Sequence, residues 1–352
     1  MPEAAAHTET PPAEAKQEAR AIGLRYISDR IPGIRRKGEP GGFYYLHDDG
    51  SRINDAATLE RIRKLVLPPA WDEVWIAPYA NAHLQATARD ARRRKQYRYH
   101  PKWRALREET KFARMLEFGA ALPDLRKRVE QDLSARGLTR EKILATAVRL
   151  LEITLIRVGN EEYAKANRSY GLTTLRNRHV EIHGSELKFE FRGKSGKQHS
   201  VGVVDRRIAR IVRQCKELPG AELFQYLDEN GQRHSIDSDD VNSYLRQISG
   251  ADFTAKDFRT WAGTVCALDA LLECEPCSCE TELKKTLAKV VKTVSQQLGN
   301  TPTVCRKHYI HPQVFERFAA DGLEKLRQVN RASRDMPRAE RALMELLAEQ
   351  AH

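Results

Sequence analysis

Residues 139–158 read TREKILATAVRLLEITLIRV, and their apolar side chains recur at the spacing of a helix. This spacing predicts an amphipathic helix with one buried face, ended by Gly159. From residue 180 to residue 204 the apolar period falls to two, in runs at 180–182, 187–191 and 199–203. Turn residues at 184–185 and 193–196 separate these runs. The change of period predicts a long helix followed by an insert of three short strands.

The rest of the chain divides into regions of different composition. Residues 1–20 are rich in Ala, Glu and Pro and contain no apolar core of a signal peptide, so we expect a disordered tail. Residues 21–100 favour strands and turns, and from residue 101 onward amphipathic helices dominate. The fold class that we expect is α+β: a small β-rich domain at 21–100, then a larger, mainly helical domain at 101–352 with the three-stranded insert.

Length and charge restrict the classes of function. The chain has 352 residues, and 60 Lys and Arg against 48 Asp and Glu give a net charge of +12. It contains no run of roughly 18 apolar residues, which excludes a protein that spans membranes by helices. Six cysteines without a secretion signal fit free thiols in a reducing cytoplasm. The positive surplus suggests an anionic polymer as partner, with nucleic acid as the first candidate.

Motifs for metals and nucleotides are missing from the sequence. It has no zinc signature, no phosphate-binding Walker loop and no dinucleotide fingerprint. The cysteines Cys274, Cys277 and Cys279 lie close together, but neither a second cysteine pair nor a histidine pair supplies a fourth ligand. We therefore interpret them as a thiol-rich loop between two helices. We expect no metal and no cofactor.

A basic segment, residues 89–100, reads RDARRRKQYRYH. The side chains of Arg92, Arg93 and Lys95 can pair with phosphates, and Tyr97 and Tyr99 can pack on sugars or hydrogen-bond to base edges. The alternative is a solvated basic strand at a domain edge. The position of the basic segment just before the domain junction favours nucleic-acid binding, because a hinge there could close a clamp around a duplex.

Four further residues each have a structural explanation when taken alone. Arg157 lies at the end of the predicted helix, where a cation also interacts favourably with the helix dipole. Lys194 lies in a hairpin turn, where lysine is common. Arg259 lies in the first turn of a helix, an unfavourable place for a cation. Tyr309 follows a basic, turn-rich stretch.

Taken together and in order, these positions resemble a known constellation. It consists of IRVGN at 156–160, Gly-Lys at 193–194, KDFRT at 256–260, and Asn-Thr-Pro at 300–302 leading to Tyr309. The pattern resembles the type IB DNA topoisomerases, most closely the compact poxvirus and bacterial kind, and covers nearly the whole chain from about residue 21. The resemblance implies the tyrosine recombinase/topoisomerase IB catalytic fold, an N-terminal DNA clamp, double-stranded DNA as substrate and a monomer in the bacterial cytoplasm or nucleoid.

The resemblance also implies a role for each residue. Tyr309 is the nucleophile, which forms a 3′-phosphotyrosine and expels a 5′-hydroxyl. The bond energy stays in the covalent link, so neither a nucleotide nor a metal is required. Arg157 and Arg259 hold the non-bridging oxygens, and Lys194 is the general acid for the leaving oxygen. Lys256 lies in the KDFRT motif, and we place it among the residues that bind DNA.

The chain departs from the family at one position. In the poxvirus and cellular enzymes a histidine stands nine residues before the nucleophile, and here that position is Asn300. An amide donates the same hydrogen bond without a charge, so we expect modestly weaker stabilisation of the transition state. Bacterial members of the family resemble this sequence at that position.

Two other functions are considered as alternatives. A tyrosine site-specific recombinase shares the nucleophile and the arginines, but typically carries His-x-x-Arg where this sequence has Lys256 and Arg259. The lysine and the N-terminal domain favour the topoisomerase. A non-catalytic basic DNA-binding protein would require the four-part constellation to be accidental.

Overall fold

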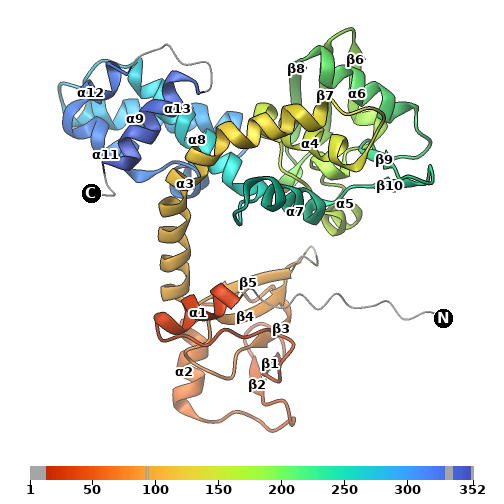
Figure 1. Cartoon of the computed structure of the whole chain (residues 1–352). Coiled ribbons are helices and arrows are strands. Elements are labelled where there is room, and N and C mark those ends of the chain that lie inside the picture. The colour runs from red at the N-terminus through yellow and green to blue at the C-terminus, as the bar shows by residue number, and fades with distance from the viewer. Residues whose placement is uncertain (1–12, 92, 94, 330–335, 350–352) are drawn as a thin grey trace. The chain divides into compact units, whose positions relative to one another are not determined.

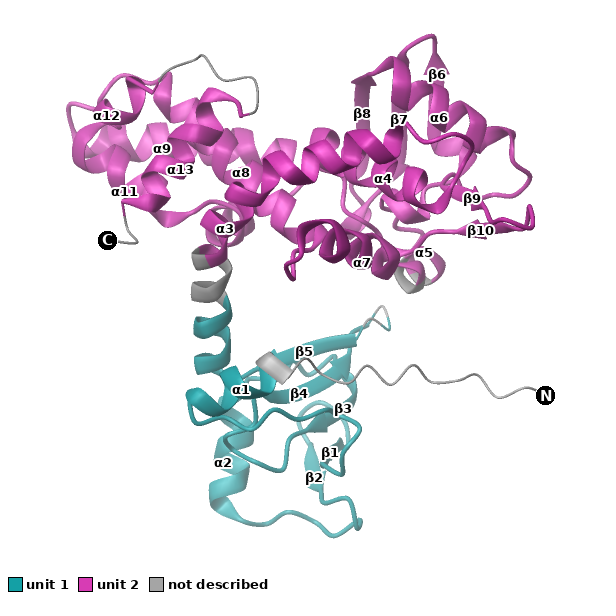
Figure 2. Ribbon diagram, in the orientation of Figure 1, with its two compact units in different colours: residues 1–111 teal, residues 112–352 magenta. Residues whose placement is uncertain are grey.

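The computed structural model describes residues 13–91, 93, 95–329 and 336–349. The chain forms two compact units, residues 1–111 and 112–352, which are shown in different colours in Figure 2. The long helix α3 (Pro101–Leu133) begins at the start of the predicted second domain, and the division between the units falls inside it. Each unit is therefore described by itself.

The first unit is built around a five-stranded antiparallel sheet with the order β2-β1-β3-β4-β5. The helix α2 follows Asp55, whose carboxylate accepts hydrogen bonds from the backbone of Ala57 and Thr58. Ile62 on α2 belongs to the same apolar cluster as Ile34 and Val74 of the sheet. The elements are α1 (Ala13–Ala21), β1 (Ile34–Lys37), β2 (Tyr44–Leu46), α2 (Ala56–Lys64), β3 (Asp72–Ile76), β4 (Leu84–Arg89) and β5 (Lys95–Tyr99).

The interpretation of residues 1–20 as a disordered tail is wrong from Ala13 onward, and residues 1–12 lie outside the described part of the chain. The helix α1 buries Ala15 and Ala19 in a cluster with Leu24 and Trp103. Alanines four residues apart share one helix face, and their small size lets the helix approach the indole closely. The low apolar content of the segment concealed this contact.

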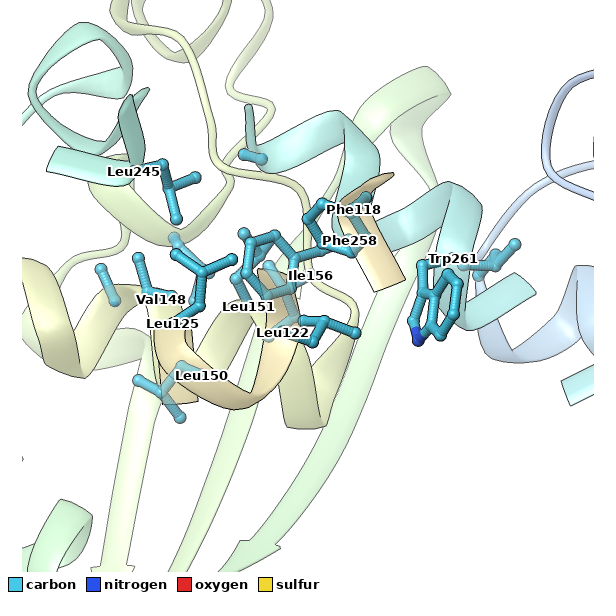
Figure 3. Packing of buried hydrophobic residues seen from close by; sticks show 14 of the residues in the cluster. Phe118, Leu122, Leu125, Val148, Leu150, Leu151, Ile156, Leu245, Phe258 and Trp261 are labelled. Carbon is cyan, nitrogen blue, oxygen red and sulfur yellow. The ribbon is translucent and has the colours of Figure 1, made fainter. Parts of the chain in front are cut away.

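The second unit is mainly helical. Its core is a continuous cluster in which Phe118 on α3 makes edge-to-face contacts with Phe253, Phe258 and Trp261, and Figure 3 shows part of this packing. Its helices are α4 (Arg140–Thr154), α5 (Glu161–Asn167), α6 (Arg206–Glu217), α7 (Ser238–Ser249), α8 (Ala255–Leu272), α9 (Glu280–Gln297), α10 (Pro302–His308), α11 (Pro312–Asp321), α12 (Glu324–Arg327) and α13 (Arg338–Ala348).

The predicted three-stranded insert is present, which confirms the α+β class. The strands β6 (Val180–His183), β7 (Glu186–Arg192) and β8 (Gln198–Val204) form an antiparallel sheet in chain order, visible in Figure 1. Along β7 buried and exposed residues alternate strictly, so one face packs into the core and the other meets solvent. A second hairpin, β9 (Gln225–Leu227) with β10 (Arg233–Ser235), was not predicted, because its strands are short and polar.

The helix predicted to run to Val158 ends at Thr154. Leu155 adopts the left-handed conformation, with a φ of 55°, and ends the helix. The following residues are extended, and the carbonyl of Arg157 accepts a hydrogen bond from the backbone of Leu172 at 2.8 Å. Apolar spacing alone could not reveal this end, because Ile156 is buried in the extended segment just as it would be in a helix.

Among the described helices, none combines the length and the apolar character that crossing a membrane requires.

Candidate active site

Arg157 reaches the site from the extended segment after α4, and not from a helix end as predicted. Its Nη2 donates a hydrogen bond to Oδ1 of Asn300, which lies in the loop between α9 and α10. Burial lowers the pKa of Arg157, and the nearby Tyr309 phenol opposes that shift. Arginine keeps its charge in such surroundings because its ordinary pKa is very high.

Arg259 is the most buried cation of the site, with 4% of its surface exposed. It lies just past the first turn of α8, which begins with the predicted capping pair of Thr254 and Asp257. One guanidinium nitrogen donates to the carbonyl of Leu155 and another to that of Leu298, the latter at 2.7 Å. Burial and then repulsion from Arg157 lower its pKa to about 10. The left-handed turn at Leu155 thus supplies one of the carbonyls that hold this arginine.

Tyr309 follows directly after α10 and is fixed by α8. Its carbonyl accepts a hydrogen bond from Thr264 Oγ1 at 3.3 Å. A side chain at Gly263 would place a Cβ atom 2.6 Å from the same carbonyl oxygen. The glycine therefore allows the close approach of α8 to the tyrosine backbone. Neither Gly263 nor Thr264 was expected at the site from the sequence. The available signal was a glycine in the middle of a predicted helix.

The phenol of Tyr309 lies in a positive environment. The guanidinium carbon of Arg259 is 5.4 Å from the centroid of the ring. Burial raises the pKa of Tyr309, but Arg259, Arg157 and finally Lys256 lower it, and the net pKa lies below the ordinary 10.0. The arrangement favours the phenolate, which is the nucleophilic form.

The side-chain amide of Asn300 uses its oxygen to accept from Arg157, and its nitrogen remains available as a donor. Within the described residues, its Nδ2 is buried and has no hydrogen-bond partner. Because the Oδ1 atom accepts from Arg157, the orientation of the amide is fixed. The structure therefore leaves a buried N–H donor beside the two arginines, as a ligand with anionic oxygens requires.

Lys194 lies in the lysine hairpin, residues 193–197, which joins β7 to β8. The turn is closed by a hydrogen bond from the backbone of Gly193 to the carbonyl of Lys197 at 2.7 Å. The Lys194 side chain is exposed, and within the described residues it has no ion pair or hydrogen bond. The structure thus gathers Arg157, Arg259, Asn300 and Tyr309, whereas Lys194 stays at the tip of its turn.

The chain is similar to proteins of one known family. The family described as eukaryotic DNA topoisomerase I, catalytic core, matches residues 100–336. The DNA topoisomerase 1B of Acanthamoeba polyphaga mimivirus is 32% identical over 296 residues, which cover 82% of this chain and 88% of the viral protein. The chain belongs to the type IB DNA topoisomerase family.

Other parts of the type IB topoisomerase chain have matches as well. Residues 42–90 match the family described as bacterial DNA topoisomerase IB, N-terminal domain. The DNA topoisomerase 1B of vaccinia virus is 25% identical over 179 residues, which cover 49% of this chain and 52% of the viral protein. The first unit therefore carries a sequence signature of its own, separate from that of the catalytic core.

The basic segment of this topoisomerase lies on β5 and the turn before it. Arg92 lies outside the described residues. Arg93 forms ion pairs with Asp72 at 2.9 Å and with Glu73 at 3.3 Å, and the Lys95 ammonium is 2.6 Å from a carboxylate oxygen of Asp29. Two of the cations predicted to contact phosphates are therefore already paired with carboxylates.

The two tyrosines of the basic segment form a stacked pair. The rings of Tyr97 and Tyr99 lie 6.0 Å apart with an angle of 6° between their planes. Tyr97 is 49% exposed, and the Lys95 ammonium lies 5.5 Å from the centroid of its ring. A flat exposed ring suits packing against sugars or bases.

The cysteines of the α8–α9 loop lie apart from the catalytic candidates in sequence and in contacts. The Cys274 thiol donates to the carbonyl of Ala270 at 3.2 Å, and the Cys277 thiol lies 3.7 Å from the hydroxyl of Thr286. All six cysteines of the chain are unpaired. In the part of the chain that the structure describes, no group of three or more His, Cys, Asp or Glu residues is arranged to hold a metal ion.

Proposed function

We propose that the chain relaxes positively and negatively supercoiled DNA by transient cleavage of one strand, through a 3′-phosphotyrosine at Tyr309. The observation that carries the proposal is the position of this phenol beside Arg259 and Arg157, with its pKa lowered by their charge. An ionisable group whose pKa is shifted by specific charged neighbours marks a candidate functional site. Membership of the type IB family supports the same chemistry.

The cleavage step is a transesterification. The Tyr309 oxygen attacks the phosphorus, the bond from phosphorus to the 5′-oxygen breaks, and the phenol loses its proton to solvent. Arg157, Arg259 and the free Nδ2 of Asn300 donate to the non-bridging oxygens, whose charge grows in the transition state. Lys194 gives a proton to the leaving 5′-oxygen. Religation is the reverse reaction, so the phosphoester bond is regenerated without nucleotide hydrolysis or a metal.

The first unit, in this proposal, is a DNA clamp that covers residues 21–100, and residues 101–352 are the catalytic domain. The match of residues 42–90 to a bacterial N-terminal domain supports this division. Within the clamp, Arg93, Lys95, Tyr97 and Tyr99 contact the duplex. We also propose that the protein is a monomer of the bacterial cytoplasm, with light scattering at low concentration as the test of the oligomeric state.

Relaxation of plasmids tests the function directly. Purified protein is incubated with positively and with negatively supercoiled plasmid in EDTA, without nucleotide, at low salt. We expect both plasmids to relax through a ladder of topoisomers, and Tyr309→Phe to relax neither. If the intact protein leaves both plasmids unchanged, the topoisomerase proposal fails. Exchange of strands between paired specific sites would instead support a recombinase.

A further inference from the structure

The imidazole of His199 is enclosed by two glycines that each precede a catalytic candidate. A side chain at Gly193 would place its Cβ atom 2.6 Å from Cδ2 of His199. A side chain at Gly299 would place its Cβ atom 2.5 Å from Cε1 of the same ring. Gly193 is followed by Lys194 and Gly299 by Asn300, so the ring lies between the backbones of the lysine hairpin and the asparagine loop.

Other contacts fix the ring and join the same two segments. His199 stacks on Phe191, with a centroid distance of 5.1 Å and an angle of 5° between the ring planes. Phe191 is buried in the core of the second unit. The Lys197 ammonium donates a hydrogen bond to the carbonyl of Asn300 at 3.0 Å. The hairpin therefore meets the loop through a packed ring on one strand and a charged hydrogen bond at its base.

We propose that His199 is a positioning residue, which docks the lysine hairpin on the Gly299–Asn300 segment and so directs Lys194 to the leaving 5′-oxygen. The inference rests on the proposed function, since it assigns a partner to the general acid. An exposed lysine at a turn tip has many accessible rotamers, and proton transfer requires a donor held within hydrogen-bond distance. A hairpin fixed at its base restricts the region in which the ammonium moves.

The ring acts as a neutral, flat spacer. Burial, followed by the charges of Arg157, Arg259 and Lys197, lowers the pKa of His199. A charged imidazolium here would add to a site that already contains several cations. Gly193 and Gly299 both lie against the edge of the ring that carries Nε2, while one face of the ring stacks on Phe191.

Single-turnover cleavage of two matched DNA substrates tests the inference. One substrate has the normal 5′-oxygen at the scissile bond, and the other has a bridging 5′-sulfur. A thiol has a pKa of about 8.5, so its anion leaves without a proton from Lys194. We expect His199→Ala to cleave the oxygen substrate roughly 10- to 100-fold more slowly than the wild type, which is less than the loss of the general acid itself would cost, because Lys194 is still present. We expect the sulfur substrate to be cleaved within about twofold of the wild-type rate, because the remaining machinery is intact.

Controls separate a loss of position from a loss of fold. His183→Ala removes an exposed histidine from the edge strand of the same sheet, and we expect it to cleave both substrates at the wild-type rate. His199→Phe retains a flat ring on Phe191, and we expect it to keep most of the activity on oxygen. If His199→Phe is as slow as His199→Ala, a flat apolar ring on Phe191 does not hold the hairpin and the spacer role is wrong.

A second pair of variants measures the contact itself. Gly193 has a negative φ of −97°, so alanine fits its backbone and clashes only with the His199 ring. We expect Gly193→Ala to slow cleavage of the oxygen substrate when His199 is present. In the His199→Ala background the same substitution should add little further slowing.

Three outcomes decide the matter. If His199→Ala cleaves oxygen at the wild-type rate, or slows sulfur as much as oxygen, the inference is wrong. If the wild type forms no covalent adduct with either substrate, the proposed function itself fails. Slow cleavage of oxygen with normal cleavage of sulfur, seen only in the His199→Ala variant and the Gly193→Ala variant, supports the inference.

Discussion

The guanidinium carbon of Arg259 lies 5.4 Å from the centroid of the Tyr309 ring. Both residues depend on α8, which carries Arg259 and also holds the carbonyl of Tyr309 through Thr264. A single helix therefore fixes the distance between the proposed nucleophile and the cation that favours its anion. This arrangement preorganises the charges before DNA binds, which is the condition under which electrostatic stabilisation of a transition state is strongest.

Replacement of Arg259 by lysine keeps one charge and removes the planar group of donors. A lysine cannot donate to the carbonyls of Leu155 and Leu298 and also to a phosphate. We expect Arg259→Lys to slow single-turnover cleavage by roughly 10²-fold or more, with DNA binding retained. Arg128→Lys, at an exposed arginine of α3 that pairs with Asp132, is the matched control. Equal cleavage rates for the two variants would contradict the assigned role.

The pH dependence of cleavage reports the pKa of Tyr309. In the proposed mechanism the phenolate attacks, so the rate should rise with pH and level off above this pKa. Arg259, Arg157 and Lys256 all lower the pKa, and removal of any of them raises it. We therefore expect Arg157→Gln to move the levelling-off to higher pH, in addition to lowering the plateau. An unchanged pH profile would mean that a different group titrates in the reaction.

Substitutions of Asn300 distinguish its donor from its acceptor. Asn300→Asp keeps an acceptor for Arg157 but replaces Nδ2 with an anionic oxygen, which repels a phosphate. We expect this variant to lose roughly 10²- to 10³-fold in cleavage rate, the size of effect seen when one oxyanion donor is lost. Asn300→His retains an N–H donor, and we expect it to stay active. The same rate constant for both variants would exclude Nδ2 as a phosphate donor.

Local patterns predicted the parts of the fold that depend on burial alone. The period of two along β7 predicted its sheet because each buried side chain needs the core face. The end of α4 was not predictable, since Leu155 leaves the helix in order to present its carbonyl to Arg259, a residue far away in sequence. The helix α1 was missed for a related reason: its alanines are buried against Trp103, and composition carries no information about that partner.

The candidate site also divides into residues that local motifs identify and residues that depend on contacts between distant segments. Tyr309, Arg157 and Arg259 could be named from ordered motifs, and the structure brings them together. The roles of Gly263 and His199 depend on backbones approaching from distant segments, and no local pattern in the sequence records such an approach. The carboxylates that pair with Arg93 and Lys95 were likewise invisible, because they come from other parts of the first unit.

The dependence of DNA affinity on salt tests the contribution of Lys95. In the free protein its ammonium pairs with Asp29. In the proposed complex with DNA, a phosphate replaces this partner. We expect Lys95→Gln to weaken binding evenly across sequences and to reduce the salt slope by about 0.9, the value for one phosphate contact. Lys325→Gln, at an exposed position on α12, serves as the control in the same fluorescence titration. An unchanged slope for Lys95→Gln would remove it from the interface.

The carboxylate of Glu340 joins three elements of the second unit. It accepts hydrogen bonds from Arg126 on α3 at 2.7 Å and from the Trp261 indole on α8 at 3.1 Å. Its removal leaves part of the charge of Arg126 without a partner in a mostly buried place. We expect Glu340→Ala to lower the free energy of unfolding by about 3 kcal/mol. In denaturant titrations the exposed Glu345→Ala should have little effect, and equal effects would contradict this role.

The central claim is that the Tyr309 oxygen becomes covalently bonded to the 3′-phosphate of DNA. A duplex whose leaving strand is too short to remain paired traps the covalent complex, and mass spectrometry of its peptides locates the linkage. We expect the trapped nucleotide on the peptide that contains Tyr309, and no adduct with Tyr309→Phe despite normal DNA binding. An adduct on another residue, or one that persists in Tyr309→Phe, would contradict the account.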